Sequence, residues 1–134
     1  MNVQGPSTAV ELPIVAVVDD DQSIRESLPD LLREFGYAAV AYSSAEEFLS
    51  SDKIGKARCL ILDVAMPGMS GLDLQRELKV RRQLIPIIFI SAHRTDSVRA
   101  NAFEEGAVRF LTKPFSDTDL LEALRAAIEA HGSS

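Results

Sequence analysis

Five short apolar segments recur along the chain, and each is followed by a stretch with apolar residues at helical spacing. The segments span residues 14–18, 37–42, 59–63, 86–91 and 108–112. Most are continuous aliphatic runs without polar alternation, which is typical of parallel strands covered on both faces. The run 37–42 is richer in alanine, so we expect it nearer an edge of the sheet. The five alternations predict one α/β domain over residues 13–130 with right-handed crossovers and helices on both faces.

The helix after the run 14–18 has clear end signals and one residue that disfavours a helix. Asp21 is a good N-cap residue, and Gly36 favours the left-handed turn that ends many helices. Pro29 lies near the middle of this stretch, where a proline removes a backbone hydrogen bond and costs about 3 kcal/mol. Because the apolar spacing holds on both sides, we expect the helix to continue past Pro29 with a kink.

Polar residues also mark the second and the last helix. Ser44 with Glu47 three residues later predicts a capping box for a short helix that ends near Ser50. Ser116 with Asp119 predicts the start of the last helix, which is expected to end near residue 130.

Two further helices are predicted between residues 71 and 106. Gly71 opens the first of them. Its apolar residues are expected to point inward, namely Leu72, Leu74, Leu78 and Val80. Thr95 or Asp96 caps the second, and Gly106 closes it.

The composition limits the classes of function. The 134 residues carry a formal net charge of −6, with 46% apolar and 25% charged residues, which is ordinary for a globular domain. An acidic domain is poorly suited to binding the phosphate backbone of nucleic acid. The single cysteine, Cys59, lies in a strand segment, where a small buried side chain is the simplest interpretation. One cysteine allows no intramolecular disulfide, which suits a reducing compartment.

The two ends of the chain lack these patterns. Residues 1–12 are expected to form a disordered leader, and residues 131–134 a frayed end or a truncated linker. We find no signal peptide and no apolar stretch of about 18 residues. The expected location is therefore the cytoplasm, without membrane contact.

Side chains that can do chemistry end four of the five strands. Asp19 and Asp20 follow the first strand, Asp63 ends the third, Ser91 ends the fourth, and Lys113 follows the fifth. In a parallel sheet these ends lie along one edge. Three carboxylates there would repel one another without a cation, and hard oxygen ligands favour Mg²⁺. With a lysine and a hydroxyl added, the set suits phosphoryl transfer to a carboxylate nucleophile.

The motifs around these residues resemble the receiver domain of two-component response regulators. The matching stretches are Val-Val-Asp-Asp-Asp at 17–21, Leu-Asp-Val-Ala-Met-Pro-Gly-Met-Ser-Gly-Leu-Asp-Leu at 62–74, Ile-Ser-Ala at 90–92 and Leu-Thr-Lys-Pro-Phe at 111–115. The resemblance covers about residues 13–130. It implies a flavodoxin-like (βα)5 fold with strand order 2-1-3-4-5.

The resemblance also implies a role for each site residue. Asp63 would be the phosphoacceptor, Ser91 would bind the phosphoryl group, and Lys113 would pair first with the carboxylate and then with a phosphoryl oxygen. The expected Mg²⁺ ligands are Asp19, Asp20, Asp63 and the backbone carbonyl of Ala65. Of the first two, Asp20 is expected to bind directly and Asp19 through water. The family also has a cis peptide at the position of Lys113–Pro114.

Two positions near the site have open interpretations. Phe110 lies at the family's aromatic switch position, where it would turn inward when Ser91 moves, or it is a plain half-buried strand aromatic. His93 could position a water molecule, or it is plain surface. Ala65 can orient no water, so we expect slow self-hydrolysis of the acyl phosphate.

The predicted function is a phosphorylation-controlled switch rather than an enzyme. The phosphoryl group would come from a sensor histidine kinase or a phosphotransfer protein, and the first helix is the family's common docking face for kinases. The sequences of the loop after Asp63 and of the fifth strand resemble those of FixJ/LuxR-type transcription factors. This resemblance implies a phosphorylation-dependent homodimer and a DNA-binding output domain absent from this chain. A stand-alone receiver or a phosphorelay intermediate is the alternative. An aspartate-nucleophile phosphatase would need a second aspartate where Ala65 stands, and an inert scaffold would not keep all five site residues.

Overall fold

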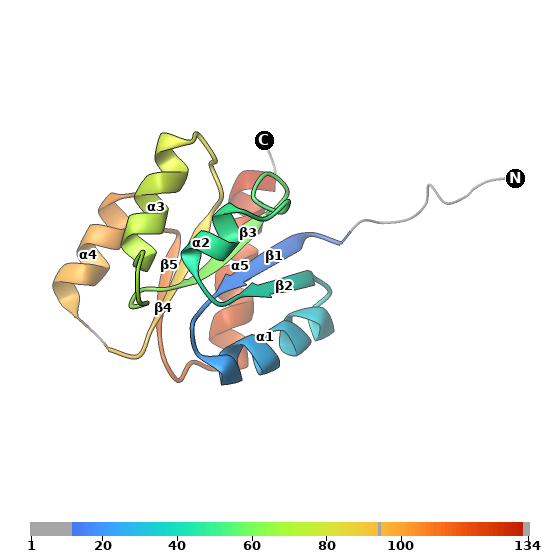
Figure 1. Cartoon of the computed structure of the whole chain (residues 1–134). Coiled ribbons are helices and arrows are strands. Elements are labelled where there is room, and N and C mark those ends of the chain that lie inside the picture. Colours follow the sequence, from blue (N-terminus) through green and yellow to red (C-terminus); the bar gives the residue numbers. More distant parts are fainter. Residues whose placement is uncertain (1–11, 94, 133–134) are drawn as a thin grey trace, which may run out of the picture.

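The computed structural model describes residues 12–93 and 95–132, and it forms one layered domain (Figure 1). Strands and helices alternate from β1 to α5. Their bounds are β1 Ile14–Val18, α1 Gln22–Glu34, β2 Ala38–Tyr42, α2 Ala45–Leu49, β3 Cys59–Asp63, α3 Gly71–Val80, β4 Ile87–Ser91, α4 Asp96–Glu104, β5 Arg109–Thr112 and α5 Asp117–Gly132. The predicted leader falls almost wholly on residues outside the described part of the chain. The last helix continues into the predicted tail, to Gly132.

The strands form a parallel sheet in the order β2-β1-β3-β4-β5, which confirms the predicted flavodoxin-like fold. The alanine-rich strand β2 lies at an edge, as expected from its composition. The register places Val18 beside Leu62 and Ser91 beside Thr112. The carboxyl ends of β1 and β3 are thus adjacent, and the order of the chain reverses between these two strands.

Helices cover both faces of the sheet, and each face has its own core. Successive strand residues alternate between the faces, so Val15 and Val17 pack on one side and Ala16 and Val18 on the other. Helices α1 and α5 cover the first side, and α2, α3 and α4 cover the second. Cys59 is buried in the first core, where burial raises the pKa of its thiol to about 12. It remains a neutral apolar side chain there, as predicted.

Helix α1 runs without interruption through its proline. The side chain of Asp21 accepts the N–H of Ser23, and Gly36 has a φ of +97° just after the helix ends. Pro29 lies in the interior of the helix and is buried. The helix is held along its length by packing of Leu28 and Leu32 into the core. This tertiary packing offsets the unfavourable intrinsic preference of proline, while the kink itself stays a prediction.

Two local predictions were wrong. Ser44 caps α2 by accepting the N–H of Glu47, but the Glu47 carboxylate accepts the N–H of Ser43 instead of completing a capping box with Ser44. Val80, which was expected to point inward, is 77% exposed. It follows the buried Leu78 by two residues, so it lies about 200° further around α3, away from the core.

No helix in the described ranges combines the length and the apolar character that a membrane crossing requires.

Candidate functional site

Three carboxylates meet where β1 and β3 end. Asp19 and Asp20 follow β1, and Asp63 is the last residue of β3. One carboxylate oxygen from each residue lies within 4.8 Å of the other two. Asp19 is fully buried and Asp63 is 6% exposed, whereas Asp20 is open to solvent. The sequence prediction that these acids come together at the sheet edge is therefore confirmed in position.

Lys113 brings a positive charge into this acidic cluster. Its Nζ donates a hydrogen bond of 2.9 Å to Oδ2 of Asp19 and lies 3.9 Å from Oδ1 of Asp63. The side chain is 18% exposed, so these interactions are only partly screened by solvent. The peptide between Lys113 and Pro114 is cis, as the resemblance implied.

The buried Asp19 has a partner at every polar group. Its Oδ1 accepts the N–H of Asp21 at 2.9 Å, its backbone N–H donates to the carbonyl of Tyr42, and its own carbonyl accepts Nη1 of Arg25 at 3.1 Å. With Lys113 on Oδ2, the fully buried charge is satisfied. Arg25 was not predicted as a site residue, because its spacing from Asp19 is that of any residue in the first helix turns.

Asp63 has a strongly raised pKa. Burial and, after it, the neighbouring charge of Asp19 raise the pKa of this carboxyl to about 7, although Lys113 acts in the opposite direction. Asp20 adds a smaller repulsion. A carboxylate in this position therefore gains from any additional positive charge.

The donor set fits a divalent cation that prefers oxygen. Asp19, Asp20 and Asp63 supply three carboxylates from the ends of two adjacent strands, and the cluster is open to solvent at Asp20. Mg²⁺ is held in proteins by one or two carboxylates together with waters and phosphate oxygens. Repulsion among these acids, which raises the pKa of Asp63, is relieved by such an ion. The part expected from the Ala65 carbonyl stays a prediction.

Ser91 ends β4 beside this cluster, with its hydroxyl engaged in its own turn. Its Oγ donates to the carbonyl of His93 at 2.7 Å and accepts the N–H of His93 at 3.1 Å. Ser91 is 7% exposed, and His93 is exposed. Any movement of the Ser91 hydroxyl toward the carboxylates has to break these two hydrogen bonds.

Phe110 is a half-buried strand aromatic. It lies on β5, and its ring centroid is 6.2 Å from that of Phe89 in the core covered by α3 and α4. This is the plainer of the two interpretations of Phe110. The expected part in switching remains a prediction.

The loop after Asp63 is held by contacts at both of its ends. A Cβ at Gly71 would overlap the carbonyl of Asp63, so the glycine is required for the close approach of α3 to the end of β3. Glu46 on α2 accepts the N–H of Met69 at 3.2 Å. This second contact joins elements 23 residues apart, and no local sequence signal points to it.

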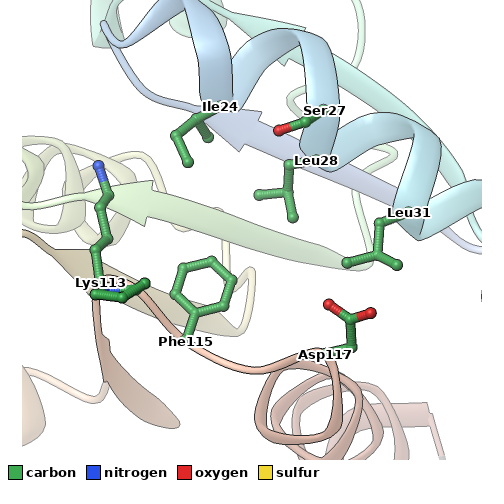
Figure 2. Close-up of a pocket in the computed structure, with 8 residues that line it drawn as sticks. Ile24, Ser27, Leu28, Leu31, Lys113, Phe115 and Asp117 are labelled. Carbon is green, nitrogen blue, oxygen red and sulfur yellow. The ribbon is translucent and has the colours of Figure 1, made fainter.

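An apolar groove of about 600 Å³ lies beside the cluster, between α1 and the segment that follows β5. Figure 2 shows Ile24, Leu28 and Leu31 pointing from α1 toward Phe115, which stands on the opposite side. Lys113 also lines this groove. The groove therefore borders the acidic cluster through Lys113.

Comparison with known proteins agrees with this geometry. The family model described as the response regulator receiver domain matches residues 15–125. The response regulator protein TodT of Pseudomonas putida is 46% identical over 116 residues, which are 87% of this chain and 51% of TodT. Nodulation protein W of Bradyrhizobium diazoefficiens is 47% identical over 125 residues, which are 93% of this chain and 55% of that protein. The chain thus spans about half the length of the curated relatives it matches.

Solved structures show the same fold. The structure of the response regulator StyR superposes with a TM-score of 0.84 at 40% identity, covering 91% of this chain and 62% of StyR. The crystal structure of FixJ-N superposes with a TM-score of 0.80 at 37% identity, covering 90% of this chain and 96% of FixJ-N.

Proposed function

The chain belongs to the response regulator receiver family, and from this premise we propose that it is a phosphorylation-dependent switch whose phosphoacceptor is Asp63. The observation that carries the proposal is the cluster of Asp19, Asp20, Asp63 and Lys113 at the carboxyl edge of the sheet. Asp63 ends strand β3 within this cluster, and burial together with the charge of Asp19 raises its pKa. It is therefore the carboxylate best placed to act as a nucleophile.

The proposed reaction is transfer of a phosphoryl group to a carboxylate oxygen of Asp63. The oxygen attacks phosphorus, the bond from phosphorus to the donor nitrogen breaks, and the electron pair leaves with the donor imidazole, which takes up a proton. The product is an acyl phosphate. Asp63 must be ionised to react, and Lys113 favours the ionised form.

Mg²⁺ would be held by Asp19, Asp20, Asp63 and the backbone carbonyl of Ala65. When bound, it supplies positive charge against the carboxylates and the phosphoryl oxygens. The chain's own residues complete the site. Lys113, which is hydrogen-bonded to Asp19 in this structure, would pair with a phosphoryl oxygen. The hydroxyl of Ser91 would donate a hydrogen bond to another phosphoryl oxygen.

The donor of the phosphoryl group is proposed to dock on α1. Response regulator receiver domains work with histidine kinases. The groove between Ile24, Leu28 and Phe115 offers an apolar contact surface beside the opening of the site (Figure 2). A kinase or a phosphotransfer protein that placed an apolar helix face there would bring its phosphohistidine toward Asp63.

The output is proposed to be transcription. In relatives with printed names such as transcriptional regulatory protein FixJ, the segment that matches this chain covers only 54% to 56% of the whole protein. In this proposal the change spreads from Ser91 and Phe110 to the surface of α4, β5 and α5, where two phosphorylated copies pair. Nucleic acid is bound by another domain, because this one has a net charge of −6. The cytoplasm is the proposed location.

Incubation with a small-molecule phosphodonor tests the proposal. The wild-type domain is expected to gain one phosphoryl group in the presence of Mg²⁺, measured by intact mass, and to lose the gain on chelation of the metal. Asp63→Asn is expected to gain none, while Asp52→Asn, a change at an exposed acid, gains one as the wild type does. No gain in the folded wild type, or an equal gain in Asp63→Asn, would contradict the proposal.

A further inference from the structure

One buried polar side chain lies outside the acidic site. Among the side chains that the structure describes, the buried polar or charged ones are Asp19, Asp63, Gln75 and Ser91. Three of these belong to the site described above. Gln75 is 3% exposed and occupies an inward position on α3, next to the buried Leu74 and Leu78. Nothing in the proposed phosphoryl transfer uses it.

Gln75 ties α3 to α4. Its Nε2 donates to the carbonyl of Ala102 at 3.1 Å, in a buried hydrogen bond between residues 27 positions apart. A carbonyl can only accept, so the amide nitrogen must face α4. The side-chain oxygen Oε1 is then buried without a partner among the residues that the structure describes. An unpartnered buried acceptor destabilises a fold, so an apolar residue would be the more stable choice if packing were the only requirement.

The carboxyl-terminal end of α4 is fixed in further ways. The carbonyl of Ala102 also accepts the N–H of Ala107, and the carbonyl of Phe103 accepts the N–H of Gly106. With Gly106 at a φ of +107°, these bonds form a Schellman motif. Both Ala102 and Ala107 are buried in the core.

An ion pair connects the same two helices at the surface. Nζ of Lys79 on α3 lies 2.8 Å from Oε1 of Glu105, the residue that follows α4. Figure 1 shows α3 and α4 next to one another on the same side of the sheet. The buried Gln75 and the exposed Lys79 thus hold the same end of α4.

The amino-terminal end of α4 is held much less. Thr95 is the N-cap residue but makes no side-chain capping hydrogen bond. In α4, all of whose residues are described, only Ala102 is buried. The weakly held end begins two residues after His93, the partner of the Ser91 hydroxyl. A change at Ser91 therefore acts next to the end of α4 whose N-cap residue makes no side-chain capping hydrogen bond.

We propose that Gln75 is a positioning residue that fixes the carboxyl-terminal end of α4 to α3, so that α4 moves about this end. The fixed end is a property of the unmodified domain. The step that moves α4 rests on the proposed function, since it begins with phosphorylation of Asp63. Movement of the Thr95 end would then alter the surface around β5 while Ala102 stays in place.

Amide hydrogen exchange along α4 tests the fixed end in the unmodified domain. Gln75→Leu removes the hydrogen bond and keeps an apolar side chain of similar size, and Gln75→Met is the second variant if the leucine is not accommodated. Exchange of the amides from Ala102 to Ala107 is expected to rise at least threefold in either variant. Gln22→Leu, an exposed glutamine on α1, is the matched control and is expected to leave α4 unchanged.

Equal exchange in the Gln75 variants and the wild type, or a rise spread evenly over all helices, would overturn the proposal. The moving end is tested in the phosphorylated wild type, where exchange is expected to change near Thr95 and to stay constant near Ala102. A change in exchange near Ala102 would overturn the proposal that α4 moves about its carboxyl-terminal end. If Asp63 accepts no phosphoryl group, the proposed function fails, and the comparison in the unmodified domain still decides the role of Gln75.

Discussion

The ammonium group of Lys113 is hydrogen-bonded to Asp19, with Nζ 2.9 Å from Oδ2, and lies 1 Å further, at 3.9 Å, from Oδ1 of Asp63. The more deeply buried carboxylate therefore has the closer cation. Asp63, the proposed nucleophile, keeps a raised pKa because burial and the charge of Asp19 outweigh Lys113. The resting site holds one compensated and one poorly compensated acid.

Removal of the Lys113 charge is expected to destabilise the domain. Lys113→Met leaves the fully buried Asp19 without its cation, which should lower the free energy of unfolding near neutral pH by about 3 kcal/mol. Urea unfolding at about pH 7 without metal measures this effect. Lys56→Met, at an exposed position, is the control and should change stability by less than about 0.5 kcal/mol. Equal effects of the two changes would show that the Asp19 pair contributes nothing specific.

Asp63→Asn is expected to stabilise the metal-free domain at neutral and higher pH. The pKa of Asp63 is raised from 3.8 to about 7 on folding, so the folded state binds the proton more tightly. The stabilisation of the folded state by this tighter proton binding is therefore full at low pH, and it is lost as the pH rises from about 4 to 7. Above that range the asparagine variant should be more stable by up to about 4 kcal/mol, since each pKa unit corresponds to about 1.4 kcal/mol, and the two proteins should converge near pH 4.

Thermal unfolding across this pH range measures the difference, which corresponds to several degrees in Tm. Adding Mg²⁺ should stabilise the wild type more than Asp63→Asn, since the ion relieves the repulsion among the acids. A variant that is less stable than the wild type at pH 8 without metal would contradict the assignment of Asp63 as a poorly compensated acid.

The position of Arg82 offers a test of backbone strain. Arg82 has a φ of +60° just after α3, where the N–H of Arg82 bonds to Lys79 and that of Gln83 bonds to Leu78, as in a Schellman motif. Glycine adopts this conformation without steric cost, so Arg82→Gly should raise the free energy of unfolding by about 0.5–1 kcal/mol.

Gly36→Ala is the reverse change at the equivalent position after α1, and it should lower stability by about 1 kcal/mol. Urea midpoints of both variants measure the effects. Destabilisation by Arg82→Gly would show that the arginine side chain contributes contacts that outweigh the strain.

The acyl phosphate is expected to be long-lived. The position two residues after Asp63 is Ala65, which is exposed and carries no polar side-chain atom to orient a water molecule. Phosphate release should therefore take many minutes or longer in Mg²⁺, and Ala65→Asn should accelerate it several-fold. Release within seconds in the wild type would reject this prediction, and His93→Ala would then test whether the exposed imidazole assists hydrolysis.

Much of the site was predictable because it depends on strand ends. In a parallel sheet, a carboxylate that ends a strand must lie at the same edge as the others, so the sequence alone predicts that Asp19, Asp20 and Asp63 lie together. Apolar runs of about five residues, each bounded by polar or turn-forming residues, likewise indicated the strands.

Features that depend on tertiary distances were not predictable. A polar Gln75 on the inward face of α3 gave no apolar signal, and its hydrogen-bond partner Ala102 lies 27 positions away in the sequence. Lys113 is hydrogen-bonded to Asp19 and not to Asp63 because its Nζ lies 1 Å closer to the carboxylate of Asp19. No local sequence pattern records such a distance.

Hydride reduction tests the central claim most directly, because an aspartyl phosphate is reduced to homoserine while a free carboxylate is not. The wild-type domain would be treated with a small-molecule phosphodonor and Mg²⁺, reduced with borohydride, digested and sequenced by mass spectrometry. We expect homoserine at position 63, and none when Mg²⁺ is chelated. Homoserine at Asp19 or Asp20, or none at any aspartate of the treated domain, would contradict it.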